Sequence, residues 1–183
     1  MKKRIKQILT RSFSMNHFIK LRRMVESGGG GVLQKAYEIV YKRYINRYGA
    51  FLPIDCIIGD NVIFPHGING VFISSAARIG NGCVIFHQVT IGSNTLPDSK
   101  GKGAPIIGNN VYIGAGAKII GNVKVGDNVR IGANCVVIQD IPDNTTVVLP
   151  KPNVIHHKEI LDNSFIPIKK FEEEESAIKD LSE

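Results

Sequence analysis

Two histidines, His66 and His87, are the residues whose type and spacing suggest catalysis in this sequence. An imidazole can accept a proton from a poorly acidic hydroxyl near neutral pH, so each is a candidate general base. They are 21 residues apart, and each stands two places after an apolar residue, Phe64 or Ile85. Whether their side chains meet depends on the elements that carry them. Two surface histidines that coincide by chance are the alternative.

Other chemistries have less support from the sequence. A zinc site needs at least a third ligand, and His17, His156 and His157 lie outside the repeats that carry the pair, so no metal is expected. The three cysteines lack CxxC spacing, which predicts small buried residues in a reducing cytoplasm. No GxSxG motif appears, so a covalent mechanism is not expected.

The histidines belong to a region built on a six-residue repeat. A small or β-branched residue follows most of the lead residues by four places. Six residues per side and eighteen per turn suit a triangular coil, whose stacked turns pair as parallel strands about 4.8 Å apart. The repeat therefore predicts a mainly β fold, a parallel β-helix. Its lead residues are Ile58, Phe64, Ile73, Ile79, Ile85, Ile91, Ile107, Ile113, Ile119, Val125, Ile131 and Val137.

Two breaks in the repeat decide where the histidines lie. Three extra residues fall around Gly67–Gly70, so the histidine spacing is one turn of eighteen plus three. The two histidines are therefore expected at equivalent places on successive coils, about one strand spacing apart. The second break, between Ile91 and Ile107, predicts a protruding loop over residues 93–104. Insertions in a solenoid become loops on one face, which is often the binding face.

The flanking regions differ in charge from the repeats. Residues 1–48 hold 12 of the 23 Lys and Arg residues against two acids, and read as a basic helical region interrupted by Gly28–Gly31. The repeats occupy 49–142, and 143–183 reads as a closing segment with an acidic tail that includes Glu172–Glu175. The basic start predicts either a weak contact with an anionic membrane surface through residues 1–23 or a plain solvated face.

Partners and location follow from what the sequence lacks. It has no Trp and no nucleic-acid recognition motif, so no nucleic acid is expected as a partner. The basic amino terminus is not followed by an apolar signal-peptide core, and no apolar run approaches the roughly 18 residues of a membrane span. A cytoplasmic location is therefore expected, with the inner membrane face as a second option.

Two stretches carry a resemblance to a known family: Ile-Phe-His-Gln-Val-Thr-Ile-Gly at 85–92, and residues 107–123, which include Gly-Ala-Gly-Ala-Lys-Ile-Ile-Gly-Asn-Val. They resemble the hexapeptide-repeat acyltransferases, most closely the serine acetyltransferases and the related polysaccharide and sugar O-acetyltransferases. The likeness covers about residues 50–155. It implies a left-handed β-helix, a homotrimer, and acetyl-CoA as a co-substrate in the groove between neighbouring subunits.

The resemblance also implies roles for particular residues. The stretch 58–66 matches the family segment that ends in the catalytic histidine, so His66 is expected to be the general base for direct acetyl transfer. His87 is expected beside it as a second catalytic residue. For each lysine among the implied acetyl-CoA-binding residues, a solvated charge is the alternative. Those residues are Gly114, Ala115, Gly116, Lys118, Gly132 and Ala133, with Lys100 and Lys102 from the loop.

Departures from the serine acetyltransferases bear on the acceptor. Those enzymes place an aspartate fifteen residues before the histidine, where this chain has Phe51, and an acid directly before it, where this chain has Pro65. Their loop carries Arg-His-Pro, and the corresponding stretch here is Gly103-Ala104-Pro105. The sequence therefore predicts a sugar or polysaccharide hydroxyl as acceptor. Serine O-acetylation, N-acetylation of an amino sugar and a non-catalytic trimeric scaffold are the alternatives.

Overall fold

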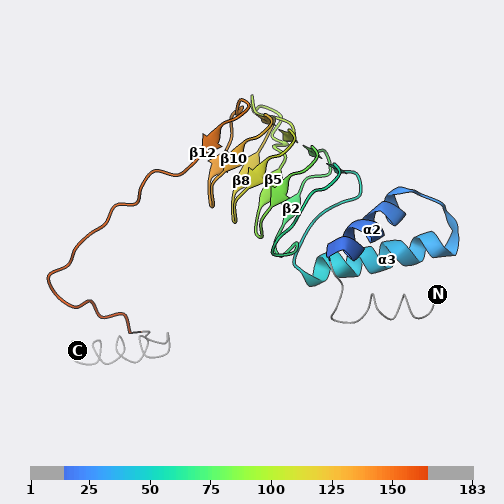
Figure 1. Ribbon diagram of the computed structural model, residues 1–183, viewed down its shortest axis with the longest axis horizontal. Helices are drawn as coiled ribbons and strands as arrows, with labels where there is room; N and C mark the ends of the chain where they lie inside the picture. The colour runs from blue at the N-terminus through green and yellow to red at the C-terminus, as the bar shows by residue number, and fades with distance from the viewer. Residues whose placement is uncertain (1–14, 165–183) are drawn as a thin grey trace, which may run out of the picture. The chain divides into compact units, whose positions relative to one another are not determined.

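The computed structural model describes residues 15–164, which belong to two compact units, 1–149 and 150–183. The described part of the first unit, 15–149, contains two helices followed by a stack of short strands (Figure 1). The described part of the second unit, 150–164, has no helix or strand, and its side chains are exposed. The basic residues Lys2, Lys3, Arg4 and Lys6 and the acidic run Glu172–Glu175 lie outside the described residues.

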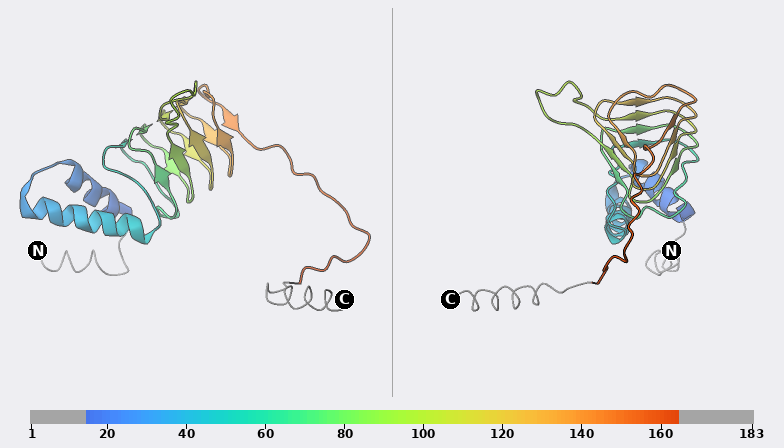
Figure 2. Two further views of the ribbon diagram at one scale, coloured as in Figure 1. Left: turned by 180° about the vertical axis from the view of Figure 1, so that it is seen from behind. Right: turned by 90° about the vertical axis from the view of Figure 1, so that its left-hand side faces the viewer.

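The strands form three parallel sheets that make the sides of a triangular coil, and the right-hand view of Figure 2 shows the turns of this coil stacked on one another. The three middle coils each give one strand to each sheet. Sheet A holds β2 (Phe72–Ile73), β5 (Thr90–Gly92), β8 (Lys118–Ile120) and β11 (Val136–Val137). Sheet B holds β1 (Ile57–Ile58), β3 (Arg78–Ile79), β6 (Ile106–Ile107) and β9 (Lys124–Val125). Sheet C holds β4 (Val84–Ile85), β7 (Tyr112–Ile113), β10 (Arg130–Ile131) and β12 (Thr146–Val147).

The strand register shows both insertions at the predicted places. Ile58 pairs with Ile79, 21 residues further on, because the coil between them contains the three extra residues. Ile79 pairs with Ile107, 28 residues on, because that coil contains the loop, which projects from the coil in Figure 2. The last coil is short, with Arg130 paired to Thr146. The six-residue spacing therefore ends near residue 141, although one more strand pairs beyond it.

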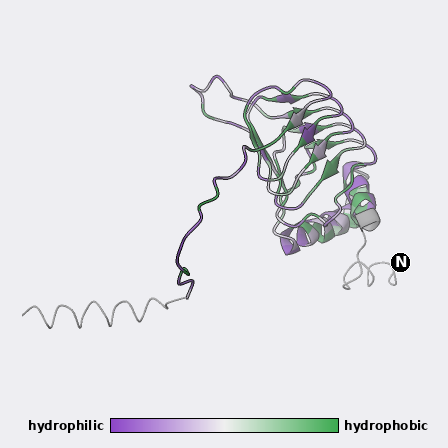
Figure 3. Ribbon diagram, turned by 60° about the vertical axis from the view of Figure 1, so that its left-hand side comes forward, coloured by the Kyte–Doolittle hydropathy of each residue, from purple (hydrophilic) through white to green (hydrophobic). Residues whose placement is uncertain are grey.

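The lead residues of the repeat fill the centre of the coil. All of them except Ile58 are at most 3% exposed, and Ile58 is half-buried in the first coil. The small residues four places later are buried as well. Inward and outward positions alternate along each strand, which gives the mixed colouring of the strands in Figure 3. Full burial of an aliphatic side chain contributes about 1.5–3 kcal/mol, so the repeat itself is the core. The predicted fold class is confirmed.

Helices α2 (Met15–Glu26) and α3 (Gly31–Arg47) are joined at the glycine run and pack against the first coil. Phe18 stacks on Tyr41 and Tyr44, with ring centroids 5.6 and 5.1 Å apart. The main chain of α3's end also reaches the insertion, because the Gly70 N–H donates to the Tyr48 carbonyl over 2.9 Å. Neither described helix is long and apolar enough to cross a lipid bilayer.

Arg22 joins α2 to the first coil. Its side chain is only 3% exposed, and its guanidinium donates to the Tyr41 hydroxyl over 2.9 Å and pairs with Glu26 over 2.7 Å. The Tyr41 hydroxyl in turn donates to the Leu52 carbonyl over 2.6 Å. The guanidinium also donates to main-chain carbonyls of the first coil, those of Leu52, Pro53, Ile54 and Cys56. A buried cation held by carbonyl oxygens fixes the helices on the end of the β-helix.

Candidate active site

His66 and His87 occupy the same corner of the coil on two successive turns. This corner, where each turn passes from sheet C to sheet A, comprises residues 66–70, 86–88, 114–116 and 132–134 and is called the histidine corner below. The Nδ1 atoms of the two rings are 3.0 Å apart, and the ring centroids are 5.0 Å apart. His66 is exposed and His87 is half-buried. The structure thus brings together the two histidines that the spacing placed on neighbouring coils.

The contact between the two Nδ1 atoms assigns complementary roles to the rings. A hydrogen bond between them requires one Nδ1 to carry a proton and the other to offer a lone pair. The ring that donates then has an unprotonated Nε2, which is a base. The ring that accepts has its proton on Nε2, which is a hydrogen-bond donor. The pair therefore presents one proton acceptor and one N–H donor to the outside of the coil.

Two further residues hold the pair, and the sequence analysis did not single them out. The Phe86 ring lies edge-on to His66, with centroids 5.1 Å apart and an interplanar angle of 88°. Asn69 donates from Nδ2 to the His66 carbonyl over 2.7 Å. Phe86 directly precedes His87, and Asn69 lies in the three-residue insertion. The sequence shows that Phe86 and Asn69 lie close to the two histidines. The six-residue repeat does not predict in which direction a side chain at a corner points, so their contacts could not be foreseen.

The small residues expected to bind acetyl-CoA continue the histidine corner on later turns. The Gly116 N–H donates to the His87 carbonyl over 3.0 Å, and the Asn134 N–H donates to the Ala115 carbonyl over 2.8 Å. Two of the glycines are explained by coil packing alone. A Cβ on Gly114 would lie 2.6 Å from the Ala133 nitrogen, and Gly116 has φ +71° with Asn134 directly beside it.

What remains at the surface of this corner is a column of small side chains. Ala133 is exposed and Ala115 is half-exposed, so neither is committed to the core. Gly132 is half-exposed, and a Cβ there would lie 3.2 Å from the Val147 carbonyl oxygen. A narrow ligand could lie along this column against the backbone. The binding role of these residues stays a prediction.

The three lysines lie in two separate places. Lys118, on β8, donates from Nζ to the Gln88 carbonyl over 2.7 Å, which ties it to the histidine corner. Lys100 and Lys102 are exposed on the loop, which leaves the coil at the next corner, between sheets A and B. The loop is closed at its base by paired Asn94 and Gly103. Within one chain, the structure does not bring the loop lysines to the histidines.

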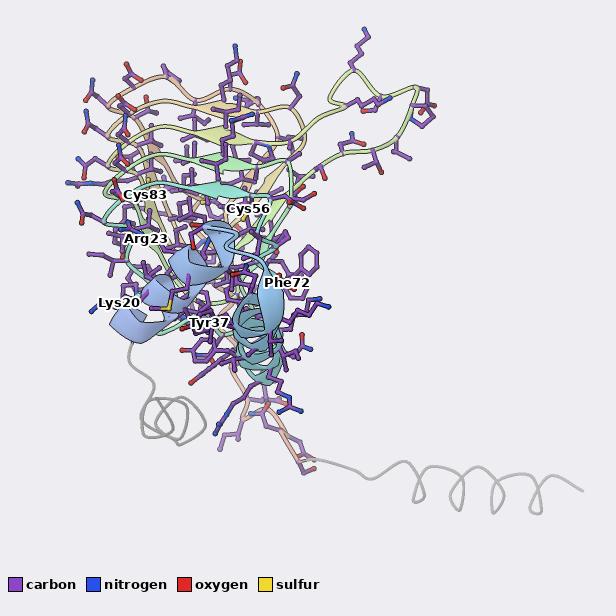
Figure 4. The ribbon with its side chains drawn as sticks, turned by 90° about the vertical axis from the view of Figure 1, so that its right-hand side faces the viewer. Lys20, Arg23, Tyr37, Cys56, Phe72 and Cys83 are labelled. Carbon is purple, nitrogen blue, oxygen red and sulfur yellow. The ribbon has the colours of Figure 1, made fainter. Side chains whose placement is uncertain are left out.

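The cysteines are inert in this arrangement. Cys56, Cys83 and Cys135 are free and buried, as the sequence predicted, and the first two are labelled in Figure 4. Burial raises the pKa of the Cys56 and Cys83 thiols, which disfavours the reactive thiolate. Residues 15–164 contain no group of three His, Cys, Asp or Glu side chains that could hold a metal ion.

Comparisons with known proteins agree with this architecture. The sequence pattern of the family described as "Bacterial transferase hexapeptide (six repeats)" matches residues 104–139. The chain is 40% identical over 114 residues to a serine acetyltransferase of Synechococcus elongatus, which covers 60% of this chain and 46% of that protein. It is 44% identical over 98 residues to a serine acetyltransferase of Helicobacter pylori, which covers 54% of this chain and 56% of that protein. The chain is a hexapeptide-repeat protein similar to the serine acetyltransferases.

Solved structures extend the likeness of this hexapeptide-repeat protein to the fold. Serine acetyltransferase isoform 3 from Entamoeba histolytica, in complex with cysteine, matches with a TM-score of 0.64 and 32% identity over 78% of this chain and 50% of that one. The Neisseria gonorrhoeae serine acetyltransferase in complex with serine matches with a TM-score of 0.59 and 30% identity, over 74% and 55%. These matches confirm the predicted left-handed β-helix. The hexapeptide-repeat protein spans about half the length of the relatives it matches.

Proposed function

We propose that this protein is an acetyl-CoA-dependent O-acetyltransferase. The observation that carries the proposal is the His66–His87 pair, with 3.0 Å between the Nδ1 atoms, at one corner of a coil similar to that of the serine acetyltransferases. The pair supplies a base and an N–H donor at one surface position, and acyl transfer to a hydroxyl needs both.

In the proposed reaction His66 donates from Nδ1 to His87 and uses Nε2 as the base. Nε2 takes the proton of the acceptor hydroxyl as the oxygen attacks the thioester carbonyl carbon. The oxyanion that forms there is stabilised by N–H donors, for which the His87 Nε2–H is available. Collapse of this intermediate breaks the carbon–sulfur bond, and the proton on His66 passes to the departing thiolate. The products are the acetyl ester and the free thiol, without an acyl-enzyme.

Residues of the histidine corner are proposed to hold the co-substrate. The small side chains of Ala115 and Ala133 leave room beside His87 for a narrow pantetheine arm. Lys100 and Lys102 are proposed phosphate ligands, although they lie at another corner of the same chain. A homotrimer would allow the loop of a neighbouring subunit to supply them, so this role depends on the proposed assembly.

L-serine is the first acceptor to test. The relatives that match the coil are named serine acetyltransferases, and two of the matched structures contain serine. They favour serine over the saccharide that the sequence predicted. The chain's own differences, Phe51 and Pro65 in place of acids, mean that the amino group of serine would need another partner in this protein.

A saccharide remains the second candidate because of a hollow on sheet A. Phe51 and Phe72 stack there with centroids 6.4 Å apart, and both rings are about half exposed; Phe72 is labelled in Figure 4. The hollow has a volume of about 360 Å³. The polar side chains that line it all carry hydroxyl groups, and they are those of Ser74, Ser75, Thr90 and Ser93. Flat apolar rings beside hydroxyl groups suit a sugar ring better than a charged amino acid.

The test is thiol release from acetyl-CoA with L-serine, amino sugars, free and nucleotide-linked sugars, and bacterial polysaccharides as acceptors. His66→Ala is expected to lower turnover by about 10²- to 10⁴-fold, the usual contribution of a general base. His156→Ala, a histidine outside the coil, is the matched control and should keep wild-type turnover. Turnover that survives in the His66 variant would overturn the mechanism. No turnover on any acceptor, together with no binding of CoA by calorimetry, would favour the scaffold alternative.

A further inference from the structure

We propose that Lys118 is a positioning residue for the histidine pair and not a ligand of the acetyl-CoA phosphates. It would act by holding the main chain of the histidine corner through Gln88 and Asn69. The inference rests on the proposed function for its kinetic consequences, but the contacts that support it belong to the chain alone.

Three hydrogen bonds connect Lys118 to the main chain of His66. Lys118 donates from Nζ to the Gln88 carbonyl over 2.7 Å. The Gln88 N–H donates to the Asn69 carbonyl over 2.8 Å. Asn69 donates from Nδ2 to the His66 carbonyl over 2.7 Å. The connection crosses three successive turns of the coil, and Gln88 directly follows His87, so both histidines are attached to it.

Gln88 needs external support because of its backbone conformation. Its φ is +58°, in the left-handed region that residues other than glycine and asparagine rarely adopt. At the equivalent corner position of the next two turns the chain has Gly116 and Asn134. Every other non-glycine residue with positive φ within 15–164 is an asparagine. A glutamine held in this conformation beside the histidine pair indicates that its surroundings fix it.

Lys118 supplies that support at an otherwise unpaired atom. Among the described residues no main-chain N–H donates to the Gln88 carbonyl, and Lys118 is its donor. A hydrogen bond from an ammonium group is stronger than one between neutral groups. Lys118 is half-buried on β8, and this bond turns its charge toward the protein. Phosphate binding would require the same ammonium group to leave Gln88 or to share its protons.

The insertion is built around the same glutamine. Gly70 has φ +61°, and a Cβ added there would lie 3.2 Å from Cγ of Gln88. Gln88 therefore lies directly against Gly70, at the end of the insertion that follows His66. A change in the Gln88 backbone would shift His87 relative to the insertion, and this would separate the two imidazoles.

The test compares Lys118→Met with Lys118→Arg and with the matched control Lys124→Met, which removes an exposed lysine from β9. If Lys118 positions the pair, Lys118→Met should lower kcat by about ten- to a hundredfold and change the KM for acetyl-CoA by less than about twofold. Lys118→Arg, which can still donate to the carbonyl, should recover most of kcat. Adding Gln88→Gly to Lys118→Met should also restore activity, because glycine adopts the left-handed conformation without support.

A readout independent of activity keeps the two proposals apart. Long-range ¹H–¹⁵N NMR of the histidine side chains reports which ring nitrogens carry protons. Lys118→Met should change the His66 and His87 signals, and Lys124→Met should not. A raised KM for acetyl-CoA that varies with salt, with kcat and the NMR signals unchanged, would make Lys118 a phosphate ligand and overturn the positioning role. Unchanged kinetics and NMR signals would also overturn it. If the wild type has no transferase activity but Lys118→Met still alters the histidine signals, the positioning role is supported and the proposed function is refuted.

Discussion

Replacing Arg22 with alanine should strongly destabilise the protein, because the guanidinium satisfies main-chain carbonyls that few other groups can reach. The Leu52 carbonyl keeps its bond from Tyr41, but the buried Cys56 carbonyl, 2.6 Å from the guanidinium, loses its donor. An orphaned buried acceptor costs about 1–3 kcal/mol. The Pro53 carbonyl keeps the N–H and the thiol of Cys56 as donors, but the part-buried Ile54 carbonyl also loses its donor. The charge left behind, on Glu26, is exposed, so the cost comes from the orphaned carbonyls and from the lost packing of a buried side chain, and we expect about 3–5 kcal/mol in total.

Thermal unfolding followed by far-ultraviolet circular dichroism measures this loss. A change of 1 kcal/mol moves Tm by roughly 2–4 °C in a chain of this size, so Arg22→Ala should lower Tm by about 10 °C. Protein concentration must be the same for all variants, because stability would depend on it if the chain forms the proposed homotrimer. Arg23→Ala is the matched control on the same helix. Arg23 pairs with Asp60 at the surface, with 58% and 73% of the two side chains exposed, and such pairs contribute about 0–1 kcal/mol.

The two variants together decide whether the guanidinium acts as the geometry indicates. Equal, small effects of Arg22→Ala and Arg23→Ala would refute the reasoning, because the carbonyls would then be satisfied without the guanidinium. Arg22→Lys adds a graded test. Its single ammonium group can reach fewer of the carbonyls, so its stability should fall between those of the wild type and Arg22→Ala.

Three further predictions concern the pair, the helices and the coil. His87→Asn, whose side-chain oxygen can still accept from Nδ1 of His66, should retain more turnover than His87→Leu in the thiol-release assay; equal turnover would argue against the pairing. Burial raises the pKa of Tyr41 to about 12. The Tyr41 hydroxyl of the unfolded chain loses its proton near pH 10, so the stability that Tyr41 contributes should be complete below pH 10 and lost as the pH rises to about 12. In urea unfolding, the free energy of unfolding should therefore fall less over this pH range in Tyr41→Phe than in the wild type. Gly116→Ala should cost about 1–3 kcal/mol in the same unfolding assay, because φ there is +71° and Asn134 blocks the added methyl group; an unchanged midpoint would contradict this.

The six-residue spacing predicted the coil because burial on the inside leaves little freedom. Each lead residue must point inward, so an insertion changes the register by its own length. The 21-residue pairing of Ile58 with Ile79 and the 28-residue pairing of Ile79 with Ile107 could therefore be obtained by counting. The same counting placed His66 beside His87. It stopped near residue 141, because the short last turn pairs Arg130 with Thr146 at a different spacing.

Contacts made by long polar side chains were not predictable in this way. Arg22 precedes the coil, and nothing in the helical pattern shows that its guanidinium reaches the carbonyls of residues 52–56. Lys118 lies in a stretch that resembles a CoA-binding segment, which suggested a phosphate ligand, but its Nζ lies on Gln88. A flexible side chain has several rotamers at similar energy, so its partner depends on the folded surroundings.

The division between inward and outward positions also explains where function can vary in this coil. Every inward lead position is fixed by packing, so relatives with different acceptors can share this core and still have the same pattern of aliphatic residues. The groups that would distinguish acceptors lie on outward positions, such as Phe51 and Phe72 on sheet A and Tyr112 on sheet C. Similarity over the coil therefore supports the shared reaction more strongly than it supports the acceptor. We therefore propose the aromatic hollow and the histidine corner as the surfaces to vary when the acceptor is sought.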